Sequence, residues 1–161
     1  MHLVPVTNIG APVFPFRHVY DNPIARRIYF VYGDVYDYEN INRPTMEDAV
    51  PGFFGGGNLT FFEHISLMIR ASEARDARGK NAYWQHLENF QVPINFITGE
   101  HNKMFVPKGL QRSYDHLRAA NPPGDYTHHV FKNYAHLDCW LGTNAERDTF
   151  PTALAELEKH N

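Results

Sequence analysis

Cysteine is almost absent from this chain of 161 residues, since Cys139 is the only one. A single cysteine cannot form an internal disulfide, which excludes the disulfide-stapled class of small proteins. Long apolar runs are absent too. No run reaches the roughly 18 residues that a membrane-spanning helix needs, and the N-terminal segment lacks the basic and continuously apolar regions of a signal peptide. We therefore expect neither a membrane span nor a leader, and no compartment is indicated.

Neither sign of charge dominates the sequence. Its 15 basic and 18 acidic residues give a net charge of -3. This balance predicts no basic surface for a polyanion, so a nucleic-acid partner is not expected. Apolar residues make up 43% of the chain and aromatic residues 14%, which is typical of a globular domain and not of a disordered chain.

The secondary-structure signals are weakest in the first part of the chain. Residues 1–58 mix proline, glycine and aromatic residues without a clear period, which indicates short helices and turns. Thr60 and Glu63 then form a capping box before an apolar face at helical spacing. This pattern predicts a helix over about residues 60–78, and a shorter helix is expected over about residues 81–90.

The clearest pattern lies in the last part of the chain. The segments "VPINFIT" (92–98) and "YTHHVFK" (126–132) are predicted to be strands. Each is followed by a loop and then by a helical apolar face, and the first helix stops at "NPPG" (121–124). This repeated order of strand, loop and helix predicts an α/β fold with a parallel sheet covered by helices.

Polar side chains follow both predicted strands directly. Glu100, His101 and Asn102 come after the first strand, and His136 and Asp138 come after the second. In open α/β sheets, ligands and chemistry gather beyond the carboxyl ends of the strands. We therefore expect the two loops to meet. A histidine there can act as a general base near neutral pH, and an acid on the neighbouring loop can fix its tautomer.

The second strand and the loop after it also contain potential metal ligands, namely His128, His129, His136, Asp138 and Cys139. A metal site is the less favoured interpretation, because the spacing fits no closed zinc pattern and adjacent histidines on a strand point to opposite faces. Cys139 is expected to be a buried apolar residue and not a nucleophile.

The motifs "VPINFITGEHNKMFVP" and "YAHLDCWLGTNAERDTFP" resemble the carboxyl-terminal third of an α/β-hydrolase. They are similar, more narrowly, to the hydrolase modules that accompany cholesterol-oxidase-type flavoproteins and, more distantly, to the acid lipases. "FGGGNLTFFEHISLMIR" resembles the cap of those modules, so the likeness covers roughly residues 50–161. The resemblance implies that His136 is the catalytic histidine, that residues 1–91 form a cap-like helical region, and that residues 92–161 form the C-terminal part of the hydrolase core.

The chain departs from that family at the triad acid. The family's acid lies three residues after the glycine that closes the strand, and counting from Gly99 this position is Asn102, which carries no charge. An amide can orient an imidazole but cannot offset the charge that develops on it as a carboxylate would. Three alternatives stay open: Glu100 or Asp138 replaces the acid, or Asn102 orients the histidine in a weakened triad.

The nucleophile is the second departure. The family carries it on a G-x-S-x-G elbow, whereas the serines of this chain lie in predicted helices without flanking glycines: Ser66, Ser72 and Ser113. The fold expected from the resemblance is therefore a partial α/β-hydrolase, made of a helical cap and the last two parallel strands with their helices.

The function implied by the resemblance is ester hydrolysis through an acyl-serine, with His136 as general base to a serine outside this chain and with no cofactor. The cap that the resemblance implies favours a lipophilic ester as substrate. Aromatic residues of the first region can line a pocket for such a group or merely pack on the sheet: Phe14, Phe16, Tyr29, Phe30, Tyr32, Tyr36, Tyr38, Phe53 and Phe54. The alternative is a non-catalytic remnant or binding module. In either case, an exposed sheet edge predicts a homo-oligomer or pairing with a missing N-terminal half.

Overall fold

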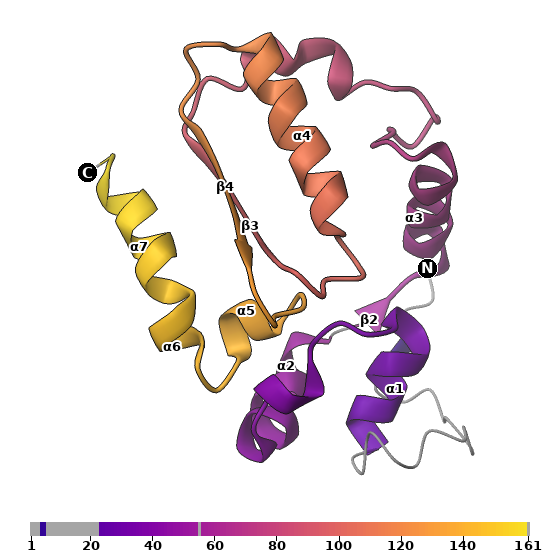
Figure 1. The fold of residues 1–161 in the computed structure, drawn as a ribbon. Helices are drawn as coiled ribbons and strands as arrows, with labels where there is room; N and C mark the ends of the chain where they lie inside the picture. The colour runs from indigo at the N-terminus through magenta and orange to yellow at the C-terminus, as the bar shows by residue number, and fades with distance from the viewer. Residues whose placement is uncertain (1–3, 6–22, 55, 161) are drawn as a thin grey trace.

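The structure is a computed structural model that describes residues 4–5, 23–54 and 56–160 (Figure 1). Its strands are β1 (Val4–Pro5), β2 (Gly56–Gly57), β3 (Ile94–Gly99) and β4 (Tyr126–Phe131). Its α-helices are α1 (Pro23–Tyr32), α2 (Val50–Phe53), α3 (Leu59–Ala71), α4 (Pro107–Ala120), α5 (Asp138–Leu141), α6 (Ala145–Asp148) and α7 (Phe150–Glu158). Two 3₁₀-helices, η2 (Tyr38–Asn40) and η4 (Trp84–Asn89), and one π-helix, η3 (Thr45–Ala49), complete the set within these residues.

The centre of the fold is a parallel pair of strands. β3 and β4 pair in register from Ile94 beside Tyr126 to Gly99 beside Phe131, and α4 forms the crossover between them. β1 and β2 form a separate, antiparallel pair. The predicted α/β class with a parallel sheet is confirmed at this level.

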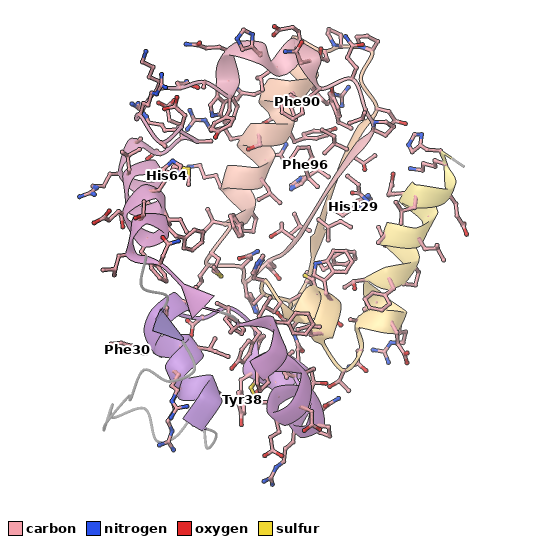
Figure 2. All side chains as sticks on the ribbon, turned by 180° about the vertical axis from the view of Figure 1, so that it is seen from behind. Phe30, Tyr38, His64, Phe90, Phe96 and His129 are labelled. Atoms are coloured by element: carbon pink, nitrogen blue, oxygen red, sulfur yellow. The ribbon has the colours of Figure 1, made fainter. Side chains whose placement is uncertain are left out.

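Helices cover both faces of the parallel pair (Figure 1). Side chains alternate along a strand, so neighbouring residues face opposite helices. Phe96 packs against Tyr114 of α4 with ring centroids 6.3 Å apart, whereas His129 of β4 lies 3.1 Å from Glu156 of α7 (Figure 2). Both strands and the helices after them therefore lie where the sequence predicted them, to within a few residues.

The helix predicted over about residues 60–78 is shorter than expected. Its N-cap is Asn58, whose Oδ1 accepts a hydrogen bond from Phe61 N at 2.8 Å, so the predicted capping box of Thr60 and Glu63 is wrong. The helix ends at Ser72, which adopts a left-handed φ of 53°. The segment at 81–90 forms the 3₁₀-helix η4 instead of an α-helix.

The N-terminal region packs at the carboxyl ends of β3 and β4 (Figure 1). Its apolar core consists of Ala25, Ile28, Val35, Tyr36, Ile41, Met46 and Val50, and Leu137 and Leu141 from the other end of the chain pack against it. Two backbone hydrogen bonds join the regions: Leu137 N donates to Val35 O at 2.8 Å and Thr143 N donates to Asn40 O at 2.7 Å. The predicted regions 1–91 and 92–161 thus pack together through this apolar core.

Replacing His128 by phenylalanine should stabilise the protein by about 1 kcal/mol. The Nε2 of His128 is buried without a hydrogen-bond partner, and its ring stacks on Tyr114 with centroids 5.8 Å apart. Burial, helped by the neighbouring His129, lowers the pKa of His128 from 6.5. As the pH falls through and below 6.5, the unfolded chain therefore binds more protons at His128 than the folded protein does. His128 thus lowers the stability of the protein as the pH decreases. His128→Phe should weaken this dependence.

Urea denaturation at pH 5.5 and 7.5 checks this expectation. His129→Phe is the matched control, because its ring is paired with Glu156 at 3.1 Å. It should leave stability unchanged or lower it. A His128→Phe variant less stable than the unsubstituted chain at both pH values would contradict the assignment of an unpaired buried nitrogen.

Candidate functional site

The loops that follow β3 and β4 lie against each other through their backbones. Glu100 N donates to Phe131 O, and His101 N donates to Tyr134 O, both at 2.8 Å. Gly99 permits this approach, because a Cβ at that position would overlap the carbonyl oxygens of Tyr134 and of the next residue. The two loops therefore meet at one rim of the sheet, as their place after parallel strands predicted.

His136 contacts Asn102 across this rim. Asn102 is 4% exposed, and its Nδ2 lies 3.3 Å from His136 Nδ1 and 3.1 Å from Thr98 Oγ1. Its Oδ1 accepts hydrogen bonds from Met104 N and Phe105 N, each at 3.0 Å. The side-chain amide of Asn102 thus has four hydrogen-bond partners, two at each end.

The ring of His136 is half-buried between apolar neighbours. The Phe105 ring lies 5.1 Å from it, centroid to centroid. Burial lowers the pKa of His136 below 6.5, and the charge of Asp138 opposes this shift only in part. The imidazole is therefore neutral at pH 7, which is the state that a general base or a neutral hydrogen-bond donor needs.

Asp138 occupies a structural position. Its side chain is fully buried, and both carboxylate oxygens accept from Ala135 N at 3.0 Å, while Oδ2 also accepts from Asn40 Nδ2 at 2.7 Å. No hydrogen bond joins it to His136 within the described part of the chain. The alternative in which Asp138 serves as the triad acid does not fit this geometry, since its oxygens are occupied by the backbone and by Asn40.

Glu100 also lies away from the histidine. Its side chain is exposed, and Oε2 accepts from Asn133 N at 3.4 Å. The neighbouring His101 pairs with Asp37 at 3.1 Å and so ties the loop to the N-terminal region. Of the three alternatives for the position beside His136, the structure brings only Asn102 into hydrogen-bond contact with the ring. Glu100 instead accepts from Asn133 N.

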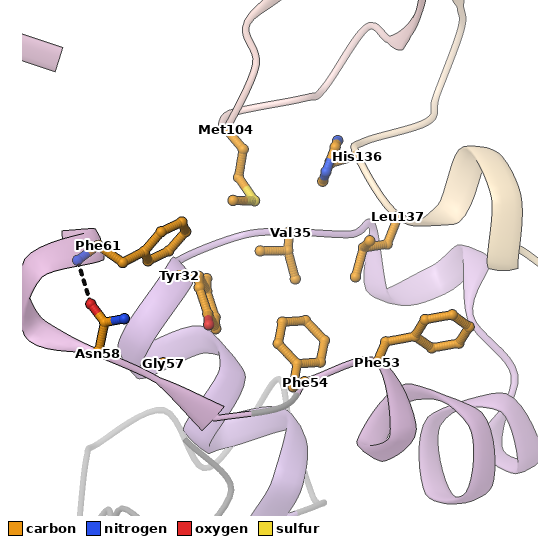
Figure 3. Close-up of a pocket in the computed structure, with 10 residues that line it drawn as sticks. All are labelled: Tyr32, Val35, Phe53, Phe54, Gly57, Asn58, Phe61, Met104, His136 and Leu137. Atoms are coloured by element: carbon orange, nitrogen blue, oxygen red, sulfur yellow. Dashed lines mark hydrogen bonds between the residues drawn. The ribbon is translucent and has the colours of Figure 1, made fainter. Parts of the chain in front are cut away.

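An apolar pocket of about 370 Å³ opens beside His136 (Figure 3). This volume falls at the lower end of the roughly 300–1,000 Å³ typical of small-molecule sites. Its lining comes from the N-terminal region and from both rim loops: Tyr32, Val35, Phe53, Phe54, Gly57, Asn58, Phe61, Met104, His136 and Leu137. The pocket thus combines a largely apolar wall with the imidazole of His136 and with two further polar residues, Tyr32 and Asn58.

Three of the aromatic residues predicted to line a pocket do so, namely Tyr32, Phe53 and Phe54. Tyr36 is instead part of the buried core, and Phe30 and Tyr38 are exposed (Figure 2). Phe14 and Phe16 lie outside the described residues. Phe61 and Met104 were not predicted, because nothing in their local sequence separates a pocket residue from an ordinary helix or loop residue.

Nothing in the described ranges gathers three histidine, cysteine, aspartate or glutamate side chains in a metal-binding group. His128 faces α4 and His129 faces α7, as their adjacent positions predicted. Cys139 is buried, and burial raises the pKa of its thiol to about 12. The thiol is therefore protonated at neutral pH and unsuited to nucleophilic attack.

Across the part of the chain that the structure covers, no helix has both the length and the apolar character needed to cross a membrane.

The chain was also compared with known proteins. A scan against protein-family models, a search of curated proteins and a search of solved structures each found no match.

Proposed function

We propose that this chain forms the histidine side and the lid of an acyl site in a serine-dependent α/β-hydrolase that acts on lipophilic carboxylic esters. The contact between His136 and Asn102 at the carboxyl rim of two parallel strands, beside an apolar pocket, is the observation that carries this proposal. The resemblance of the two C-terminal motifs to the family supports it.

In this proposal, His136 takes the proton of an attacking hydroxyl and returns it to the leaving alcohol. The pocket receives the apolar acyl chain, and Asn102 sets the angle of the imidazole ring. The attacking hydroxyl comes from outside this chain. The three serines support that view, because Ser66 lies within α3, Ser72 is its C-cap, and Ser113 in α4 donates to Gly109 O at 3.2 Å.

The second candidate function is a non-catalytic module that binds a lipophilic acyl compound. The direction of the Asn102 amide favours it, because an amide that donates to Nδ1 does not prepare the ring to accept a proton at Nε2. Both candidates leave one edge of β3 and one edge of β4 unpaired within the described residues. We propose for both that a second polypeptide segment or a second copy of the chain pairs there.

Hydrolysis of a short chromogenic ester tests the assignment of the nucleophile. The isolated chain and its His136→Ala variant should hydrolyse p-nitrophenyl butyrate at the same background rate, since no serine lines the pocket in the described part of the chain. Turnover that disappears in His136→Ala would show that the nucleophile is in this chain.

The same assay on the longest in-frame product of the gene separates the two candidates. Turnover that depends on His136 supports the hydrolase. Binding of the ester without any turnover that depends on His136 contradicts the hydrolase and supports the binding module.

A further inference from the structure

The direction of the Asn102 side-chain amide is fixed by its neighbours. The backbone N–H groups of Met104 and Phe105 both point at one end of the amide, each with 3.0 Å between nitrogen and Oδ1. A backbone N–H can only donate, so this end must be the carbonyl oxygen. If the amide were turned over, its NH₂ group would face two donors. The end that faces Thr98 and His136 is therefore the NH₂ group.

This direction decides where His136 carries its proton. An NH₂ group has no lone pair to offer, so its contact with His136 Nδ1 at 3.3 Å is a hydrogen bond only when Nδ1 accepts. A neutral imidazole holds one proton, and an accepting Nδ1 leaves that proton on Nε2. Thr98 does not compete with His136 for the same N–H group, because Thr98 Oγ1 accepts from the other N–H of the Asn102 amide at 3.1 Å.

We propose that Asn102 is a positioning residue that keeps the proton of neutral His136 on Nε2, so that the pocket offers an N–H donor to the acyl oxygen of a lipophilic carboxylic acid or ester. Nε2 has no hydrogen-bond partner in the described ranges and is not one of their buried unpaired polar atoms, so it is accessible. The pocket is largely apolar, and its polar lining residues besides His136 are Tyr32 and Asn58. An Nε2–H donor in such a pocket suits a ligand with an apolar chain and an acceptor at one end. The inference rests on the location of the proposed acyl site but not on a nucleophile.

This state of the ring also restrains base catalysis. An imidazole that is protonated on Nε2 has no lone pair there to take a proton from a hydroxyl. The base state requires the Asn102 amide to turn over, which breaks the hydrogen bonds from Met104 N and Phe105 N. In Ser-His-Asp enzymes, exchanging the carboxylate for an amide costs roughly 10⁴-fold in kcat for this reason. A carboxylate at position 102 would accept from both backbone N–H groups and from Nδ1–H.

Long-range ¹H–¹⁵N correlation spectra of histidine-labelled protein at pH 8 test the tautomer. The unsubstituted chain should show His136 protonated on Nε2 alone, Asn102→Asp should move the proton to Nδ1, and Asn102→Ala should show a mixture of both forms. A His136 protonated on Nδ1 in the unsubstituted chain would overturn the inference, and so would a mixture equal to that of Asn102→Ala.

An acid titration of the unsubstituted chain keeps the inference testable if these variants do not fold. Protonated His136 carries N–H on both ring nitrogens, so it cannot accept from Asn102. The side-chain NH₂ signals of Asn102 should therefore shift together with the titration of His136. Signals that do not follow this titration would contradict the hydrogen bond.

Decanoate tests the class of ligand. Titration with decanoate should shift the Nε2 signal of His136, whereas decyltrimethylammonium, which has the same chain length and no acceptor, should not. Asn102→Asp should weaken decanoate binding about tenfold, because the lone pair on Nε2 would then face the carboxylate. Equal affinity in both proteins would overturn the ligand assignment. None of these measurements needs ester turnover, so failure of the hydrolase proposal and failure of this inference are distinguishable.

Discussion

Gly99→Ala is expected to lower the free energy of unfolding by at least about 3 kcal/mol and to separate the two rim loops. The added Cβ would overlap the backbone carbonyl groups of Tyr134 and Ala135. Backbone atoms cannot move aside like the end of a flexible side chain, so the loop that carries His136 must shift as a whole. The hydrogen bond from His101 N to Tyr134 O would be lost with it.

Urea denaturation measures the loss, and the His136 ring signals report the shift of the loop. Gly52→Ala is the matched control, because no atom lies within 4 Å of the Cβ that it adds. This exposed residue lies in α2, where alanine should be neutral or stabilise by up to about 1 kcal/mol. A Gly99→Ala protein as stable as Gly52→Ala would contradict the close approach of the two loops.

Asp138→Ala should destabilise the protein by roughly 3 kcal/mol, although the residue does not contact His136 by a hydrogen bond. Asp138 is fully buried and receives hydrogen bonds from Ala135 N and Asn40 Nδ2. Alanine removes both acceptor oxygens, so Ala135 N loses its partner and Asn40 Nδ2 keeps only Asn133 O. Asp138→Asn keeps one acceptor but directs an NH₂ group at a donor, so its loss should be smaller than that of Asp138→Ala.

Thermal and urea denaturation compare these variants with Asp115→Ala. Asp115 is exposed on α4, where it accepts from Gln111 at 2.9 Å. Its replacement should change stability by no more than about 0.5 kcal/mol. Equal small losses for Asp138→Ala and Asp115→Ala would show that the buried carboxylate does not hold the loop.

The fold was predictable where the pattern is local. The two strands of "VPINFIT" and "YTHHVFK" and the helices after them follow from short apolar segments and from the stop at residues 121–124. The start of α3 was less predictable, because Asn58 and the pair of Thr60 and Glu63 are both good capping signals two residues apart. Only the packed structure decides between them.

The site was predictable in its location but less so in its chemistry. The place of Glu100, Asn102 and His136 after parallel strands indicated one shared rim. The choice of partner for His136 depends on where the chain turns after Gly99. Gly99 has no Cβ and packs on the backbone of Tyr134, which sets that turn. Turning the chain there sends Glu100 to solvent and Asn102 into the interior.

The role of Asn40 could not be predicted. It lies in η2, far from the rim in sequence, and its Nδ2 donates to both Asn133 O and Asp138 Oδ2. No local pattern around Asn40 indicates a partner of this kind, since the contact depends on how the N-terminal region packs on the sheet. The same packing forms the pocket, whose residues Phe61 and Met104 come from α3 and from the loop after β3.

The shared rim is tested most directly by NOE cross-peaks between the rings of Phe105 and His136, whose centroids lie 5.1 Å apart. The rings of Phe96 and Tyr114, at 6.3 Å, provide an internal reference from the strand and helix that pack beside the rim. A Phe105–His136 cross-peak stronger than the reference is the expected result. A reference cross-peak without any between Phe105 and His136 would place the loops apart and contradict the proposed site.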